Sequence, residues 1–473
     1  MNTSTKYKYL LTNILAFLCG NIGTKLISFI MVPLYTNILS PMEYGEIDFI
    51  LSIVGVISPF IACGIQEAIM RFSLDKNSDT QLVLSIGLRV FFISTLFFLL
   101  IMPIFYLIPI VSKYISFIYI YSLINEIMII FLCYIRGKDN IKLYSFLGFL
   151  SGFLTAFFNI LFLVIFKWGL TGYKFSMILS PFFTTIFAII LGNIKKDISI
   201  KKWNKKLAIE MIKYSLILIP NAILWWCINA SDRFFVSYMC GTRANGLYAV
   251  SYKIPTLLST ISSILMQSWE MSAIKEYENK ENSDFYNEIY RTLIFTMGVA
   301  TIALIFANRK IMSVYVGSSY RSAWIYSPFL MASFFFGSLG TFWGSFYIAT
   351  KRMNKYLNSA IVGAIVNVVL NYILISRMGP IGAAIATMVG YLVVMIVRAR
   401  GISNNFEINV INKEFISTII CLFLSIVFSY GSGMLFIYLG LSNIILYFIL
   451  NKSLINSFIN MGMKIIKKMK NKK

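Results

Sequence analysis

Ionisable side chains inside long apolar segments are the residues of this sequence best suited to chemistry. Four of them are cations: Lys25, Arg89, Arg233 and Lys253. A charged side chain within a hydrocarbon layer is costly, so each one is a candidate for a functional role. Such cations could bind an anion through charge-assisted hydrogen bonds, and an arginine can contact it through two parallel N–H groups.

Two of these cations also have a purely structural explanation. Arg89 and Lys253 lie close enough to the expected ends of their segments for the side chains to reach a polar interface. Lys25 and Arg233 are harder to explain in this way, because each lies in an otherwise apolar segment. We therefore expect Lys25 and Arg233 to face each other across a polar cavity, with Lys253 as a third cation near its outer end and Arg89 as a fourth candidate.

Three carboxylates in apolar segments are candidates for coupling to an ion or a proton: Glu67, Glu126 and Asp232. Glu67 lies four residues before Arg71, and an ion pair on a helix surface explains this spacing as well. Glu126 has no basic residue within one helical turn, which suits a proton-coupling site. Histidine is absent from the 473 residues, so any proton relay must use carboxylates.

The cysteines do not indicate metal or redox chemistry. There are six, far apart and mostly within apolar runs, and none forms a C-x-x-C motif. We interpret them as small buried hydrophobic residues. We expect no metal site and no cofactor.

The composition indicates that these segments are transmembrane helices. Hydrophobic residues make up 58% of the chain and charged residues only 13%, whereas a soluble protein carries about 25% charged residues. A spanning helix needs about 20 apolar residues, so about 14 such helices would occupy about 60% of the chain. We predict an all-α polytopic membrane protein with about 14 transmembrane helices, including single spans at 47–69, 214–239 and 247–269.

The distribution of the 42 lysine and arginine residues predicts the orientation of these helices. If the N-terminus is cytoplasmic, most of these residues fall on the cytoplasmic side, including the basic runs at 195–206 and 464–473. We therefore expect both termini and segment 193–213 to be cytoplasmic. The net charge of +23 is spread over short loops, as expected beside anionic lipids, and does not indicate nucleic-acid binding.

This orientation places a short hairpin, residues 36–46, outside the membrane. It contains no lysine or arginine. We expect Glu43 and Glu46 to form a solvated face, Gly45 to permit a tight turn, and Asp48 to cap the next helix.

The chain also contains an internal repeat. Three pairs of segments match: SPMEYG at 40–45 with GTRANG at 241–246, YSFLGFLSGFLTAFFN at 144–159 with YLNSAIVGAIVNVVLN at 356–371, and WGLTG at 168–172 with MGPIG at 378–382. Parallel repeats of this kind are typical of transporters, with the substrate path between the two halves. We predict a six-helix bundle at 1–200, a second one at 201–405, and two further helices with a basic tail at 406–473.

Four segments resemble a known family. PLYTNILSPMEYGEIDFI at 33–50 and ASDRFFVSYMCG…NGLYAVSYKI at 230–254 are similar to the bacterial polysaccharide biosynthesis family of Wzx-type flippases. IVNVVLNYILI at 365–375 and GPIGAAIATMVGY at 379–391 are shared more widely, across the multidrug/oligosaccharidyl-lipid/polysaccharide exporter superfamily. Together the four segments extend over both halves of the chain.

The resemblance implies two six-helix bundles around a central cavity that opens alternately to the two sides of the bacterial cytoplasmic (inner) membrane. It implies a non-enzymatic flippase that moves undecaprenyl-pyrophosphate-linked oligosaccharides to the outer leaflet for O-antigen or capsule assembly. The cations would then hold the pyrophosphate. Expected partners are this substrate, membrane lipids, and polysaccharide polymerase and chain-length proteins.

Three alternatives stay open. A flippase for the peptidoglycan lipid precursor would share the fold and the pyrophosphate group. A multidrug exporter of the same superfamily would more naturally use an acidic cavity, whereas the cations here favour an anion. A membrane-embedded polysaccharide polymerase or ligase would be expected to present a large outer loop with catalytic Arg or His, and the sequence predicts no such loop.

Overall fold

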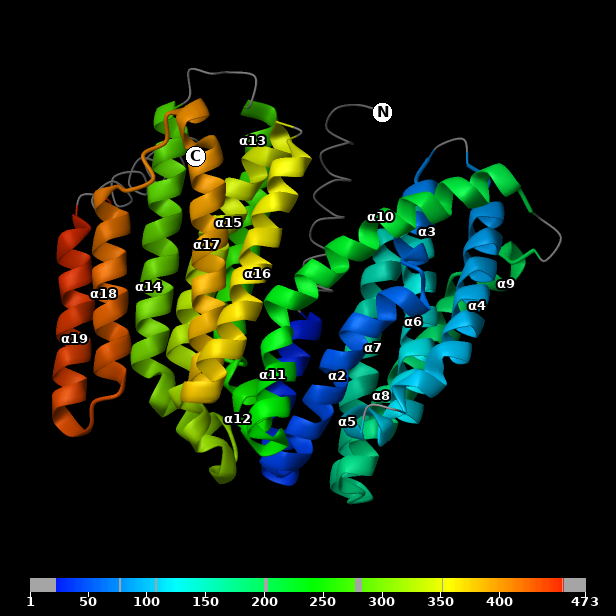
Figure 1. The fold of residues 1–473 in the computed structure, drawn as a ribbon, viewed down its shortest axis with the longest axis horizontal. Coiled ribbons are helices and arrows are strands. Elements are labelled where there is room, and N and C mark those ends of the chain that lie inside the picture. The colour runs from blue at the N-terminus through cyan, green and yellow to red at the C-terminus, as the bar shows by residue number, and fades with distance from the viewer. Residues whose placement is uncertain are drawn as a thin grey trace, which may run out of the picture. The chain divides into compact units, whose positions relative to one another are not determined.

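The computed structural model of this chain is entirely helical (Figure 1). It describes residues 23–75, 78–106, 109–199, 203–276, 283–350, 352–452 and 454, and no strand occurs within them. The chain divides into two compact units, 1–246 and 247–473.

The first unit has a core of buried apolar side chains. Phe49, Ile69, Phe91 and Tyr134 belong to one buried core within it. Its elements are a helical stretch at 23–38, α2 (Pro41–Ile61), α3 (Ile65–Ser73), α4 (Thr80–Phe105), α5 (Pro109–Ser112), α6 (Ile115–Gly137), α7 (Ile141–Asn159), a π-helical turn η1 (Ile160–Ile165), α8 (Gly169–Leu191), α9 (Ile194–Asp197), α10 (Lys205–Asn229) and α11 (Ser231–Cys240), followed by the start of α12 (Thr242–Ser251).

The second unit contains most of the remaining long helices. After α12 come α13 (Pro255–Glu276), α14 (Ser283–Tyr315), a 3-10 helix η2 (Ser318–Ile325), α15 (Ser327–Ala349), α16 (Met353–Met378), α17 (Pro380–Phe406), α18 (Lys413–Ser429) and α19 (Gly433–Leu450). In Figure 1, α18 runs between α14 and α19, and it contacts both helices.

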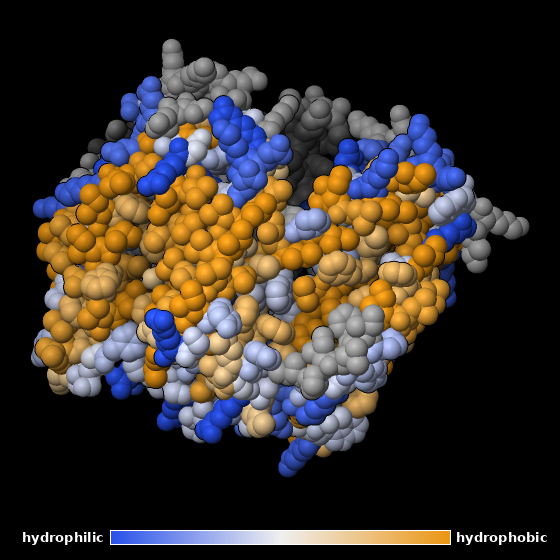
Figure 2. Space-filling view, in the orientation of Figure 1, coloured by the Kyte–Doolittle hydropathy of each residue, from blue (hydrophilic) through white to orange (hydrophobic). Residues whose placement is uncertain are grey.

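The helices have the lengths and surfaces of membrane spans. Eleven helices within the described residues are long and apolar enough to cross a membrane. Three further expected spans correspond to the helix described from 23 to 38, to α12 with α13, and to the 17-residue α18. Figure 2 shows hydrophobic residues over the middle of the helices and hydrophilic residues near their ends. The prediction of an all-α protein with about 14 spans is thus confirmed.

Three predicted continuous spans are interrupted in the structure. Span 47–69 is divided because Cys63 (φ 52°) and Gly64 (φ 61°) adopt left-handed backbone conformations after α2. Span 214–239 is divided at Ala230, whose φ of −141° is not helical. Span 247–269 is divided before α13, where Pro255 cannot donate a backbone hydrogen bond to the preceding turn. Apolar composition could not predict these interruptions.

The predicted hairpin at 36–46 is much shorter in the structure. The first helix continues to residue 38, and α2 begins at Pro41. Ser40 is the N-cap: its hydroxyl accepts from the Glu43 backbone N–H, and the Glu43 carboxylate accepts from the Ser40 backbone N–H at 2.8 Å. The prediction that Asp48 caps this helix is therefore wrong, and Glu43 has a defined role instead of forming a solvated face. SPME matches the S-x-x-E capping box, a signal that the sequence did contain.

The repeat is visible in local backbone geometry. Gly169 and Gly379 begin the two matching hairpins with positive φ values of 53° and 61°. Three residues later, Gly172 and Gly382 pack so closely against the preceding helix that a Cβ atom would contact it at less than 3 Å. Superposition of two six-helix bundles, with boundaries at 200 and 405, stays a prediction.

Candidate substrate-binding and coupling site

Two carboxylates near the start of α2 project in opposite directions. Glu46 and Asp48 are two residues apart, which is about 200° around a helix. Glu46 forms ion pairs with Lys174 of α8 at 3.1 Å and with Lys113, just before α6, at 3.6 Å. The prediction of a solvated Glu46 is therefore wrong. Its side chain is only 12% exposed and joins α2 to α8 and to the turn before α6.

Asp48 faces the other way and joins α2 to α11 and α12. Its Oδ1 accepts a hydrogen bond from Arg233 Nη1 at 3.0 Å. Its Oδ2 accepts from Asn245 Nδ2 at 3.3 Å, and the same amide group donates to the Gly45 carbonyl oxygen at 3.0 Å. Asp48 is 7% exposed and Asn245 is fully buried. We call Asp48, Arg233 and Asn245 the α2 charge cluster.

A contact between two glycines brings these groups together. Gly45 lies within α2 and does not form a turn, contrary to expectation. A Cβ atom on Gly45 would collide with the Thr242 carbonyl oxygen, and one on Gly246 would collide with the Pro41 carbonyl oxygen. The matching segments 40–45 and 241–246 of the repeat therefore meet backbone to backbone, where only glycine fits.

The break between α10 and α11 positions Arg233. Trp226, in the last turn of α10, donates to the Ser52 carbonyl oxygen of α2 at 2.6 Å. The helical conformation is interrupted at Ala230, and α11 presents Arg233 to Asp48, about one helical turn of α2 before Ser52. Arg233 is 27% exposed, so its guanidinium is partly accessible while its charge is balanced by Asp48.

The other predicted cations occupy different surroundings. Lys25 is exposed on the first helix and forms no ion pair within the residues that the structure describes. The Arg89 guanidinium lies over the Trp203 ring, 5.2 Å from its centre, in a cation–π contact. Lys253 lies in the turn between α12 and α13 and is half-buried. Arg233, by contrast, lies in the α2 charge cluster, paired with Asp48, which also binds Asn245.

The three candidate carboxylates also differ. Glu126 of α6 is 4% exposed, and its Oε2 has no hydrogen-bond partner within the described residues. Asp232 is buried in the first turn of α11 and accepts a hydrogen bond from the Arg233 backbone N–H at 2.8 Å. Glu67 is exposed. The expected pair of Glu67 with Arg71 is not formed, because Arg71 pairs with Asp75 at 2.6 Å.

One buried cation, Arg398, was not among the residues predicted from the sequence. Arg398 of α17 is 8% exposed and forms no ion pair within the described part of the chain. Its Nε donates to Ser359 Oγ and its Nη1 to the Gly340 carbonyl oxygen, both at 2.9 Å. The guanidinium also lies over the Tyr356 ring at 4.2 Å. It directly follows an apolar run, and no sequence signal distinguished it from a loop residue.

The chain is similar to known proteins over most of its length. A family model described as polysaccharide biosynthesis protein matches residues 10–270. No curated protein sequence matches the chain significantly.

Solved structures share the fold at low sequence identity. The lipid II flippase MurJ in an inward closed conformation superposes with a TM-score of 0.70 at 15% identity, covering 93% of this chain and 100% of that one. An outward-facing multidrug resistance MATE family transporter of the MOP superfamily gives 0.56 at 15% identity, covering 83% and 94%. A MOP superfamily transporter from Pyrococcus furiosus, whose binding pocket is described as having reverse polarity, gives 0.56 at 14% identity, covering 87% and 94%.

Proposed function

The chain belongs to the polysaccharide biosynthesis protein family, and we propose from this membership that it is a flippase for lipid-linked oligosaccharides. The substrate would be an undecaprenyl-pyrophosphate carrying a short oligosaccharide, moved from the cytoplasmic to the outer leaflet of the bacterial cytoplasmic membrane. Its destination would be a surface polysaccharide such as O-antigen or capsule. No step of this function requires the protein to act as an enzyme.

The α2 charge cluster is the observation that carries this proposal. Arg233 is partly exposed and is held by the carboxylate of Asp48. A pyrophosphate presents oxygen atoms with the same acceptor chemistry, so it can replace Asp48 as the partner of the guanidinium. Because Asp48 also accepts a hydrogen bond from Asn245 in the repeat-related segment 241–246, this exchange would loosen the contact of α2 with that segment. Arg233 would then take part in both substrate binding and the conformational change.

The remaining candidate residues would assist this exchange. We propose that Lys25, Lys253 and Arg89 add positive charge along the substrate path. Glu126 would take up and release a proton during the cycle, because it is a buried carboxyl group with one oxygen that lacks a partner within the described residues. Asp232 and Glu67 are further coupling candidates. The polyprenyl tail would remain in lipid while the charged group crosses.

The orientation forms part of the proposal. Both termini and segment 193–213 would be cytoplasmic, as the basic residues favour. The turn at Leu39–Ser40 and the α2 charge cluster would then lie toward the outer side. Polysaccharide polymerase and chain-length proteins would receive the product there.

A flippase for the peptidoglycan lipid precursor is the second candidate. The MurJ structure, titled a lipid II flippase, is covered over its full length by this chain. The same pyrophosphate chemistry would serve both substrates. A multidrug exporter is less well supported, since a partly exposed arginine suits an anion better than a cationic drug.

Complementation in two strains separates the two flippase functions. One strain would lack the flippase for an oligosaccharide repeat unit, and the other would be depleted of the peptidoglycan-precursor flippase. Our proposal predicts restored surface polysaccharide in the first strain and no rescue of growth in the second. Rescue of the second strain alone would assign the chain to peptidoglycan synthesis instead.

A further inference from the structure

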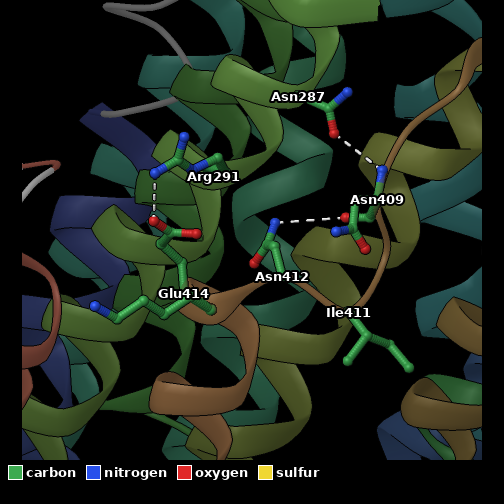
Figure 3. A pocket seen from close by; sticks show the side chains of 7 residues that line it. Asn287, Arg291, Asn409, Ile411, Asn412 and Glu414 are labelled. Carbon is green, nitrogen blue, oxygen red and sulfur yellow. Dashed lines mark hydrogen bonds and ion pairs between the residues drawn. The ribbon is translucent and has the colours of Figure 1, made fainter.

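A second polar site lies in the second unit, at the start of α14 and α18. It is a cavity of about 510 Å³ between the first turns of α14 and the segment that connects α17 to α18. Figure 3 shows Arg291 and Asn287 on one side, with Asn409, Ile411, Asn412 and Glu414 opposite them. None of these residues belongs to the candidate transport site.

Hydrogen bonds hold the connecting segment in place. Asn287 donates to the Glu407 carbonyl oxygen at 3.1 Å and accepts from the Asn409 backbone N–H at 2.9 Å. Asn412 caps α18 by accepting from the Phe415 backbone N–H at 2.8 Å. The wall of the cavity is therefore formed before any ligand binds.

The charges around the cavity do not cancel. Glu414 is 3% exposed and pairs with Arg291 Nη2 at 2.6 Å. Lys413 also lines the cavity; it is exposed and forms no ion pair with any described residue. Among the residues that line the cavity, two cations and one carboxylate leave one positive charge, so the lining favours an anionic group.

Exposed apolar side chains lie in the same stretch of chain as the polar ones. Ile411 lines the cavity and is 66% exposed, and Ile416, in the first turns of α18, is 48% exposed. A soluble anion would not need these exposed side chains. A phosphate joined to a glycerol and hydrocarbon chains would use both surfaces, and α14 is long and apolar enough to place this cavity at a membrane interface.

We propose that this cavity binds the phosphate of an anionic glycerophospholipid headgroup. Lys413 contacts the phosphate as a mobile point charge, and Arg291 contributes from its fixed position beside Glu414. Ile411 contacts the glycerol and the first acyl carbons. The site is separate from the proposed substrate path, and the lipid would fasten the α14–α18 pair to one leaflet.

Native mass spectrometry of the full-length chain in detergent tests this proposal. The probes are phosphatidylglycerol and phosphatidylcholine with identical acyl chains, and inorganic phosphate as a competitor. Lys413→Gln should weaken phosphatidylglycerol binding about five-fold, the effect of removing one cation near an anionic headgroup, and Lys413→Arg should retain it. Lys452→Gln is the matched control, because Lys452 is exposed beyond the end of α19 and its loss changes the net charge equally.

The outcomes separate the lipid from other ligands. Weaker phosphatidylglycerol binding in Lys413→Gln alone, with phosphatidylcholine bound weakly by all variants, supports the site. Equal effects of Lys413→Gln and Lys452→Gln, or equal binding of the two lipids, would overturn it. Displacement of phosphatidylglycerol by an equal concentration of inorganic phosphate would assign the cavity to a soluble anion. Since transport is not measured, a failure here leaves the flippase proposal untouched.

Discussion

Two carboxylates of α2, Glu46 and Asp48, form ion pairs with different parts of the first unit. Glu46 holds α2 to Lys113, in the turn before α6, and to Lys174 of α8, whereas Asp48 holds it to α11 through Arg233. The Glu46 contacts lie within residues 1–200. Asp48 also binds Asn245 in the repeat-related segment 241–246, so its contacts are the ones that we expect to change during transport.

Substitutions of two cations test the anion-binding role. Arg233→Lys keeps the charge but loses the planar pair of N–H donors, so transport should fall partially. Arg233→Glu and Lys25→Glu should nearly abolish transport, because a negative charge would repel the pyrophosphate. The measurement is surface polysaccharide in the complemented flippase-deficient strain, at matched membrane protein levels.

Arg243→Glu provides the control for charge reversal. Arg243 is exposed in the first turn of α12, close in sequence to Asn245 but outside the α2 charge cluster. It should support normal transport. Normal polysaccharide with both Arg233→Glu and Lys25→Glu would exclude these residues from substrate binding.

The sequence singled out Arg233 as a candidate residue but did not indicate that Asp48 would be its partner. Arg233 stood out because an arginine in an apolar segment needs an explanation. Asp48 is 185 positions away in the chain, and nothing local indicates which carboxylate an arginine will meet. Asn245 was visible only as part of a repeated segment. Long-range pairing depends on the fold, which local patterns do not encode.

Among the helices, the crossing of α2 with α12 depends on two glycines that approach each other closely. Gly45→Ala or Gly246→Ala would force the two backbones apart, and overpacking of this kind costs about 1–3 kcal/mol. Thermal unfolding of the purified protein in detergent should show a lower Tm for each variant, and transport should fall in parallel.

Gly148→Ala is the matched control for these substitutions. Gly148 lies within α7 with no atom within 4 Å of its added Cβ position, and alanine favours a helix interior over glycine. Its Tm should be unchanged or higher. If Gly45→Ala were as stable as Gly148→Ala, the close crossing would be wrong.

A partly exposed ion pair, with a tyrosine beside it, fastens the short helix α9 to its neighbours. Asp197 Oδ2 accepts hydrogen bonds from Lys138 Nζ at 2.8 Å and from the Tyr134 hydroxyl at 2.9 Å. Burial alone would raise the pKa of Asp197, but the hydrogen bonds from Lys138 and Tyr134 outweigh it and hold the pKa below its usual value.

This lowered pKa predicts a pH-dependent stability difference. A carboxyl group with a folded-state pKa below its unfolded value stabilises the fold above the unfolded pKa of about 3.9, and the contribution disappears as the pH falls through the folded pKa. The Tm difference between wild type and Asp197→Asn should therefore be constant from about pH 5 to 8. It should shrink below about pH 4. A difference that instead shrank between pH 8 and 6 would contradict this assignment.

Helix positions were predictable, whereas helix interruptions were not. Apolar runs set where α4, α6, α8 and α16 lie, because each must cover a hydrocarbon layer. The breaks at Cys63–Gly64 and Ala230 depend on single backbone conformations. Those conformations are stabilised by tertiary contacts, and hydropathy carries no information about them.

For the whole molecule, the distribution of basic residues predicts a topology that labelling can test. In a functional background without native cysteines, Asn204→Cys should resist an impermeant thiol reagent in intact cells, because segment 193–213 should be cytoplasmic. Arg243→Cys, on the proposed outer side, should react. Labelling of Asn204→Cys with protection of Arg243→Cys would reverse the orientation.

The central claim concerns the whole molecule: the chain moves a pyrophosphate-linked lipid across a bilayer, using Arg233 as an anion contact. The most direct measurement follows undecaprenyl-pyrophosphate-linked oligosaccharide in proteoliposomes that contain the purified protein, with an enzyme added outside that cleaves only the exposed oligosaccharide. We predict that wild type and Arg243→Glu will make the inner pool accessible, and that Arg233→Glu will not. Equal accessibility with Arg233→Glu, or none with wild type under any imposed ion gradient, would contradict the account.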